Sequence, residues 1–227
     1  MDRSQIKKIP VLGKWASKVY GWMNKNSGFS NSGEYWEERY RKGGNSGAGS
    51  YSNLAEFKAE VINDFISKHP IHSVMEFGSG DGNQIHYFRM PSYTGYDISP
   101  TAVRNCRKLY KEDPSKQFRL MEDYGGEKAD LTLSLDVIYH LVEDEIYERY
   151  MHRLFGASGK WVIIYSSDSD DHENNGMVKH VRHRKFTNWV AENAPGFALI
   201  LTIPNKYPFD GNGERSSYAD FFIFERK

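Results

Sequence analysis

Residues 76–82 of this sequence, EFGSGDG, place a carboxylate two positions before the first of three alternating glycines. They follow a short apolar run, and glycine at alternate positions lets a turn at the end of a strand bend tightly against a ligand. The dinucleotide fingerprint has a different spacing, Gly-x-Gly-x-x-Gly, and delivers a pyrophosphate to a helix N-terminus. A negative charge at Glu76 would repel a diphosphate. The run therefore indicates a cationic nucleoside, and S-adenosylmethionine, which carries an ammonium and a sulfonium, fits this description.

Further acidic residues stand where the next predicted strands end. Asp97 follows the glycine turn by about twenty residues, the separation at which a carboxylate accepts hydrogen bonds from a ribose diol. Ile98 beside it is placed to lie against an adenine face. After the third predicted strand, Asp123 could accept a hydrogen bond from the adenine amino group, and Glu122 could serve instead. Because parallel strands end at one edge of a sheet, these residues are expected to form one ligand site.

Short apolar segments alternate with helical patterns from residue 71 onward, which predicts an α/β fold with a doubly wound, mostly parallel sheet. Seven strands are expected, at residues 73–77, 92–96, 117–120, 131–135, 161–166, 198–203 and 221–225. Helices are expected at residues 53–68, 83–88, 100–110, 143–154 and 186–193. The link between the last two strands is polar and contains glycine, which favours an antiparallel hairpin at the end of the chain.

The N-terminal residues 1–70 are expected to form a helical cap with a Gly/Ser-rich lid over the ligand-binding domain, residues 71–227. An amphipathic pattern within residues 1–32 favours a cap helix over a helix on a membrane surface. Glycines in residues 43–50 would supply the hinge freedom of a lid. In this lid Tyr40 or Ser50 is a candidate contact for the methionine end of the donor.

At these positions the chain resembles the class I S-adenosylmethionine-dependent methyltransferase family, and the match runs from about residue 35 to the C-terminus. Residues 76–82 resemble the first motif of the family, Asp97 its ribose acid, and residues 135–141, LDVIYHL, its fourth-strand motif. The resemblance implies a seven-stranded Rossmann-like sheet with a reversed last strand, and an enzyme with S-adenosylmethionine as its cofactor. The residues expected to bind the cofactor are Tyr40, Glu76, Gly78, Ser79, Gly80, Gly82, Asp97, Ile98, Asp123, Tyr124 and Leu135.

Histidines beyond the fourth and fifth strands are the candidate bases, because methyl transfer to a hydroxyl group requires removal of a proton near neutral pH. His140 follows the fourth strand, and a structural role beside a carboxylate is its alternative. His180 and His183 belong to the basic segment 179–185, whose arginines could hold an anionic acceptor or simply face solvent. A metal site formed by His172 and these two histidines with acidic neighbours would match no established ligand spacing, so no metal is expected.

The composition excludes several classes of protein. Thirty lysines and arginines balance thirty aspartates and glutamates, so no global charge draws the chain to nucleic acid or to an anionic membrane. The single cysteine, Cys106, rules out an intramolecular disulfide and fits a reducing compartment, and a cytoplasmic location is expected. No apolar run approaches the ~20 residues of a membrane span. The fourth strand is not followed by an Asn-Pro-Pro-Tyr-like run, which argues against a nucleic-acid methyltransferase.

Together these observations predict an S-adenosylmethionine-dependent methyltransferase that acts on a small molecule, at an oxygen of a sugar or of an acidic metabolite. No nucleic-acid partner is expected. A protein or peptide methyltransferase stays open because of the acidic run at residues 168–171, and so does a catalytically silent module that binds the same nucleoside. A nicotinamide-dependent oxidoreductase is disfavoured by the glycine spacing. The identity of the acceptor and the oligomeric state do not follow from the sequence.

Overall fold

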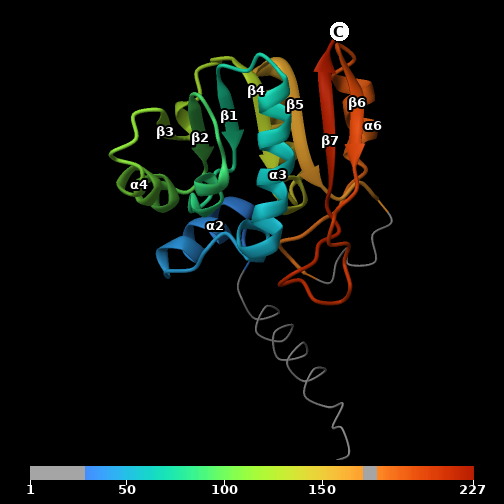
Figure 1. The fold of residues 1–227 in the computed structure, drawn as a ribbon. Coiled ribbons are helices and arrows are strands. Elements are labelled where there is room, and N and C mark those ends of the chain that lie inside the picture. Colours follow the sequence, from blue (N-terminus) through green and yellow to red (C-terminus); the bar gives the residue numbers. More distant parts are fainter. Residues whose placement is uncertain (1–28, 171–177) are drawn as a thin grey trace, which may run out of the picture.

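One seven-stranded sheet organises the molecule in the computed structural model, which describes residues 29–170 and 178–227 (Figure 1). The strands are β1 (Val74–Phe77), β2 (Tyr93–Asp97), β3 (Lys116–Leu120), β4 (Ala129–Leu135), β5 (Ser158–Ser166), β6 (Phe197–Ile203) and β7 (Asp220–Arg226). Their order in the sheet is β3-β2-β1-β4-β5-β7-β6. Strands β1 to β5 pair in parallel, whereas β7 is antiparallel to both β5 and β6. The predicted sheet with its reversed last strand is confirmed.

Helices cover both faces of this sheet. The longer ones are α3 (Ser52–Lys68), α4 (Pro100–Leu109), α5 (Asp144–Gly156) and α6 (Phe186–Asn193). Four short 3-10 helices lie between these elements: η1 (Ala48–Ser50), η2 (Asn83–Tyr87), η3 (Met121–Asp123) and η4 (Ile138–His140). Capping begins α4 after β2, since the Ser99 side chain accepts a hydrogen bond from the Ala102 amide and Pro100 occupies the first turn.

The core consists of two apolar layers, one on each face of the sheet. Along β5, Trp161 and Tyr165 enter the layer under α3 and α4, whereas Val162 and Ile164 enter the layer under α5 and α6. This alternation follows from the period of two in a strand, and burial on both faces explains the nearly continuous apolar sequence of β5. Helix α3 contributes Phe57 and other residues to the first layer, so it packs as part of the sheet domain.

Helix α2 (Ser32–Arg41) was not expected from the sequence as a separate element. It lies across the ends toward which the parallel strands point (Figure 1). Asn31 begins it, because its side chain accepts a hydrogen bond of 2.8 Å from the Glu34 amide. The amphipathic pattern predicted within residues 1–32 falls mainly outside the described residues. The carboxyl edge of the sheet is therefore covered by a helix that ends at Arg41, well before β1 begins at Val74.

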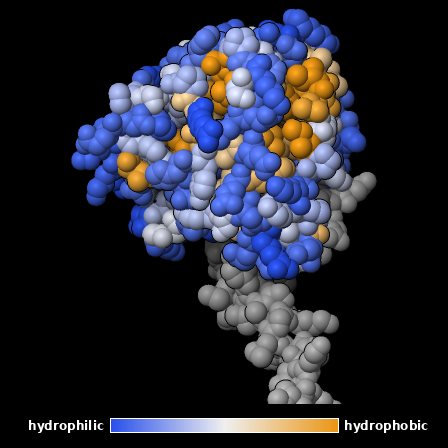
Figure 2. Space-filling view, viewed as in Figure 1, coloured by the Kyte–Doolittle hydropathy of each residue, from blue (hydrophilic) through white to orange (hydrophobic). Residues whose placement is uncertain are grey.

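The surface is mostly polar, but apolar side chains gather on the side of the molecule where β6 and β7 lie (Figure 2). Leu199, Ile200 and Leu201 of the edge strand β6 are each 46% exposed. The pairing with β7 shifts register between Leu199 and Leu201, and such a bulge discourages pairing with another sheet edge. Within the two described ranges, no helix is both long and apolar enough to cross a bilayer.

Candidate active site

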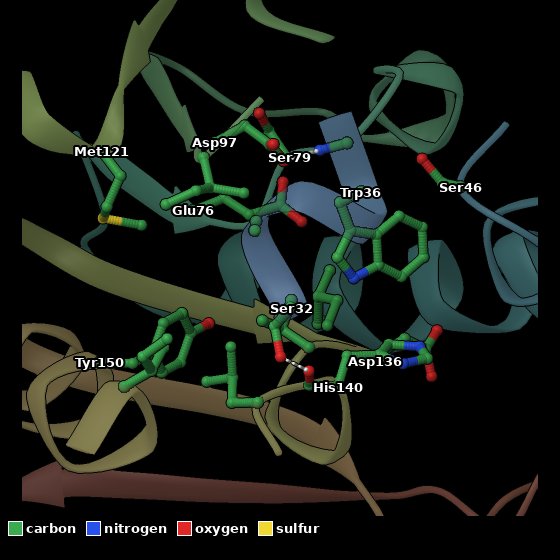
Figure 3. Close-up of a pocket in the computed structure, with 18 of the residues that line it drawn as sticks. Ser32, Trp36, Ser46, Glu76, Ser79, Asp97, Met121, Asp136, His140 and Tyr150 are labelled. Atoms are coloured by element: carbon green, nitrogen blue, oxygen red, sulfur yellow. Dashed lines mark hydrogen bonds between the residues drawn. The ribbon is translucent and has the colours of Figure 1, made fainter. Parts of the chain in front are cut away.

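A pocket of about 380 Å³ opens at the carboxyl edge of the sheet (Figure 3). The ends of β1, β2 and β4 form its floor, α2 covers it, and α5 forms one wall. Eight of the predicted cofactor residues line it: Tyr40, Glu76, Gly78, Ser79, Gly80, Asp97, Ile98 and Leu135. Gly82, Asp123 and Tyr124 do not line it. The pocket therefore brings together residues from the ends of three strands that are neighbours in the sheet, as expected for an open α/β sheet.

The glycine turn has no room for side chains. Gly78 adopts a φ of +91°, and a Cβ atom built there would lie 2.5 Å from Val137. Gly80 has a φ of +58°, and a side chain there would run into Ser46 of the covering segment. Gly82 turns away from the pocket instead, toward Cys106 and α4. These positive φ values require glycine, and the turn keeps its backbone open to a ligand.

Two buried carboxylates stand on the pocket floor. Asp97 accepts hydrogen bonds from the Gly80 amide at 2.8 Å and from the Ser99 amide at 2.9 Å, so it ties the glycine turn to the start of α4. Glu76 accepts a hydrogen bond of 2.6 Å from the Tyr93 hydroxyl. Burial raises the pKa of Glu76 to about 7 and that of Asp97 to about 6. A cationic ligand would stabilise the charged form of both groups.

Two further polar atoms on the pocket wall have no partner within the part of the chain that the structure describes. They are Oγ of Ser79 and Oε1 of Gln84, and both are buried. Such groups cost free energy unless a ligand or water satisfies them. Hydroxyl and ammonium groups can do so, and S-adenosylmethionine carries both. The glycine turn, the acids and these two atoms therefore fit that cofactor.

The side of the pocket beyond β2 matches an adenine site in part. Ile98 is 55% exposed and packs against Gly33 of α2. The predicted adenine acceptor Asp123 does not line the pocket, whereas its neighbour Glu122 does, together with Met121. Tyr124 donates a hydrogen bond of 3.0 Å to the Glu127 carbonyl oxygen. Glu122 was the alternative that the sequence left open, and it has the better position.

Helix α2 and the glycine-rich segment are tied down at three places around the pocket. At the first, Ser32 donates from its amide to Glu143 at 2.8 Å and from its hydroxyl to the His140 carbonyl oxygen at 2.8 Å. At the second, Glu37 accepts hydrogen bonds from residues 99 and 101 at the start of α4.

The third tie joins the glycine-rich segment to the glycine turn. The Asp81 carboxylate accepts hydrogen bonds from the Ser46 amide at 2.8 Å and from the Tyr51 hydroxyl at 2.9 Å. Tyr40, which lines the pocket, shares a hydrogen bond of 3.0 Å with the Ser46 hydroxyl. The three ties close α2 and residues 42–51 over the carboxyl edge.

Of the three predicted bases, His140 alone lines the pocket. Its Nδ1 lies 3.0 Å from the His180 carbonyl oxygen. Because a carbonyl oxygen only accepts, Nδ1 carries the proton and Nε2 of the neutral ring keeps its lone pair. Burial lowers the pKa of His140. The ring is therefore uncharged at neutral pH and able to take a proton.

The other two histidines have different surroundings. His180 stacks on Tyr35 with 4.2 Å between ring centroids, and its Nε2 lies 3.2 Å from the Tyr35 hydroxyl. Burial lowers the pKa of His180 to about 4. His183 is buried, and its Nδ1 lies 2.5 Å from Oγ of Ser167. Both histidines join segments behind the pocket wall, a role that sequence spacing did not indicate.

The arginines of the basic segment 179–185 are engaged near α5. Arg184 donates to the carbonyl oxygens of Leu141 and Val142 and pairs with Asp144. Arg182 pairs with Asp144 as well, and neither arginine lines the pocket. His172 lies outside the described residues. Elsewhere in residues 29–170 and 178–227, no group of three His, Cys, Asp or Glu residues is arranged to hold a metal ion.

A buried ion pair at the end of β4 was missed in the sequence. Lys58 of α3 pairs with Asp136, which lines the pocket and follows β4 directly. Asp136 also accepts a hydrogen bond of 2.7 Å from the Tyr139 hydroxyl. Its φ of +59° is rare for a residue with a side chain. No local pattern indicates this pair, because its members lie 78 residues apart.

Comparisons with known proteins agree with this geometry. Residues 75–163 match a family model described as a methyltransferase domain. No curated protein matches the chain. Among solved structures, magnesium protoporphyrin IX methyltransferase (ChlM) from Synechocystis PCC 6803 with bound SAH is similar at a TM-score of 0.61 and 16% identity, and the match covers 88% of this chain and 96% of that one.

Two further solved structures are similar in fold. The methyltransferase domain of bacterial CtHen1-C has a TM-score of 0.58 at 16% identity over 77% of this chain and 99% of its own. The N-methyltransferase NodS from Bradyrhizobium japonicum WM9 has a TM-score of 0.57 at 12% identity, over 75% of this chain and 93% of its own. Identities this low establish the shared fold, and no acceptor carries over from them.

Proposed function

We propose that this chain, whose residues 75–163 match a methyltransferase-domain model, is a class I S-adenosylmethionine-dependent methyltransferase that transfers the methyl group to a hydroxyl group of a small molecule. The observation that carries the choice of a hydroxyl acceptor is the position and protonation state of His140. It lines the pocket beside the end of β4, and its Nε2 is free of the proton that Nδ1 holds toward the His180 carbonyl oxygen.

The residues that would hold the cofactor follow from the pocket. Asp97 would accept from the ribose hydroxyls, with Ile98 and Glu122 on the adenine side. Glu76 and the glycine turn would face the methionine portion, where Ser79 and Gln84 offer their unpartnered oxygens. S-adenosylmethionine supplies an electrophilic methyl group, whose carbon–sulfur bond breaks and leaves its electron pair on sulfur.

His140 would take the proton of the acceptor hydroxyl at Nε2 as the acceptor oxygen bonds to the methyl carbon. Since burial lowers the pKa of this histidine, it stays in the neutral, proton-accepting form at pH 7. The neighbouring Trp36 ring lies edge-on to His140, with 5.0 Å between centroids, and fixes its plane. Alignment and exclusion of water by α2 supply the rest of the catalytic help.

The acceptor is proposed to be neutral near the reacting hydroxyl. The anion site expected from residues 179–185 has no support in the pocket, because Arg182 and Arg184 are bound to Asp144 and to backbone carbonyl oxygens. A hydroxylated molecule such as a sugar suits this part of the site. Arg149 and Arg153 of α5 line the same pocket, so the acceptor can also carry an anionic group away from the reacting hydroxyl.

The test is a homocysteine-release screen over neutral hydroxylated compounds, their carboxylated counterparts and short peptides. Turnover with a neutral hydroxyl compound, lost in His140→Gln, would support the proposal. Turnover with peptides alone would redirect it toward a protein methyltransferase. Tight binding of S-adenosylmethionine without turnover of any acceptor class would favour a silent binding module.

A further inference from the structure

Lys58 is a fully buried cation beside the proposed cofactor site. Its side chain has a relative exposure of 0%, and it forms an ion pair with Asp136. Its ammonium also lies 5.2 Å from the centroid of the Tyr165 ring. A buried lysine is costly unless a partner compensates its charge, so the position of Asp136 is tied to that of Lys58.

Asp136 is the member of this pair that reaches the pocket. Its side chain is 14% exposed and lines the cavity with Glu76 (Figure 3). The left-handed backbone at Asp136 is strained, and it persists because the surrounding structure holds it. The Tyr139 hydroxyl and the Lys58 ammonium both donate hydrogen bonds to its carboxylate. A strained residue that is fixed so firmly at a pocket wall indicates a role in ligand binding.

Lys58 acts electrostatically on Glu76 as well as on Asp136. Its positive charge lowers the pKa of Glu76, against the larger effect of burial. The same ammonium therefore stands near two pocket carboxylates, one on β1 and one directly after the neighbouring strand β4. Without Asp136, this buried positive charge would be uncompensated beside a pocket that is proposed to take a cation.

We infer that the Lys58–Asp136 pair sets how strongly the site prefers the charged sulfonium of S-adenosylmethionine over the neutral thioether of S-adenosylhomocysteine. Asp136 attracts the sulfonium and Lys58 limits that attraction. The inference rests on the proposed function, because it assumes that both nucleosides bind in this pocket. The two residues would then determine how strongly the site prefers the methyl donor over the demethylated product.

The direction of each charge change follows from Coulomb's law. Asp136→Asn leaves Lys58 uncompensated and should weaken binding of the cationic donor more than binding of the neutral product. Lys58→Met leaves Asp136 uncompensated and should do the opposite. Two unit charges about 10 Å apart at an effective dielectric constant of about 20 change an affinity by roughly tenfold.

Calorimetric titration of the full chain with S-adenosylmethionine and with S-adenosylhomocysteine tests this inference. The measured quantity is the ratio of the two dissociation constants, which cancels general damage to the pocket. Relative to wild type, the preference for the donor should fall about tenfold in Asp136→Asn and rise about tenfold in Lys58→Met. The double variant should return to within about threefold of wild type, because the two charges compensate each other.

Controls separate this inference from the proposed function. Lys68→Met breaks the exposed ion pair of Lys68 with Asp64 on the same helix and should leave the ratio unchanged. Equal losses of both ligands in Asp136→Asn, or an unchanged ratio in Lys58→Met, would overturn the inference. Lys58→Met alone decides the matter if Asp136→Asn does not fold. Wild-type protein that binds neither nucleoside would refute the proposed function instead.

Discussion

Replacing Glu76 by glutamine should stabilise the ligand-free protein while it weakens cofactor binding. Glu76 is 4% exposed on the pocket floor. Burial raises its pKa to about 7, whereas its ordinary value is 4.5. The folded state therefore binds the proton more tightly than the unfolded state does, and the free energy of unfolding falls as the pH rises from 4.5 to 7.

The size of this effect follows from the shift. A difference of ~2.5 pKa units corresponds to about 3 kcal/mol once both states are ionised, above pH 7. At pH 5 the cost is about 1 kcal/mol, because the carboxyl group is still protonated in the fold. Glutamine carries no charge and can keep the hydrogen bond from the Tyr93 hydroxyl. The stability advantage of Glu76→Gln should therefore grow by about 2 kcal/mol between pH 5 and pH 8.

Urea unfolding at pH 5, 6.5 and 8, followed by tryptophan fluorescence, measures this difference. Glu122→Gln is the matched control, because Glu122 lines the same pocket but is exposed. The variant at Glu76 should also bind S-adenosylmethionine at least tenfold more weakly, since a unit charge near the cation is lost. A stability difference that is constant with pH, or a variant that loses stability as the pH rises, would refute the reasoning about burial.

Three further changes probe the base, the turn and the cover. His140→Gln should lower kcat by about 100-fold or more, while the dissociation constant of S-adenosylmethionine stays within about threefold. In the wild-type enzyme, the acidic limb of the pH–rate profile should fall below pH 6.5, because burial lowers the pKa of His140. Gly78→Ala should destabilise the fold by about 1–3 kcal/mol in a thermal melt, because the backbone there has a φ of +91° and the new Cβ atom would clash with Val137. Gly156→Ala, at a position with open space around it, should cost much less. Glu37→Gln should loosen α2 from the start of α4 and so speed dissociation of S-adenosylmethionine in stopped-flow measurements. The exposed control Glu38→Gln should leave the dissociation rate unchanged. An unchanged rate in Glu37→Gln would mean that α2 does not gate the pocket.

The strands and the glycine turn could be predicted because their signals are local. The central strands β1, β4 and β5 are short segments rich in apolar residues. The rule that ligands bind at the carboxyl edge then gathers Glu76, Asp97 and Leu135 into one pocket. The turn needs glycine for its backbone, so Gly78 and Gly80 are visible in the sequence itself.

The remaining site residues depend on contacts between distant segments. Asn31 followed by Glu34 is a capping signal that could have located α2, but nothing local says that this helix crosses the pocket. Lys58 reads as one more charged residue of α3, and only the fold shows that it is buried against Asp136. His180 and His183 are of a residue type that can act as a base, and only the packing of the fold shows that they lie outside the pocket.

Calorimetric titration of the purified chain with S-adenosylmethionine, S-adenosylhomocysteine and NAD at pH 8 is the most direct measurement. The buried acids and the glycine turn predict saturable binding of both adenosyl ligands, a loss of at least tenfold in Asp97→Asn, and no uptake of NAD. Binding of NAD with no heat from either adenosyl ligand would contradict the assignment of the pocket.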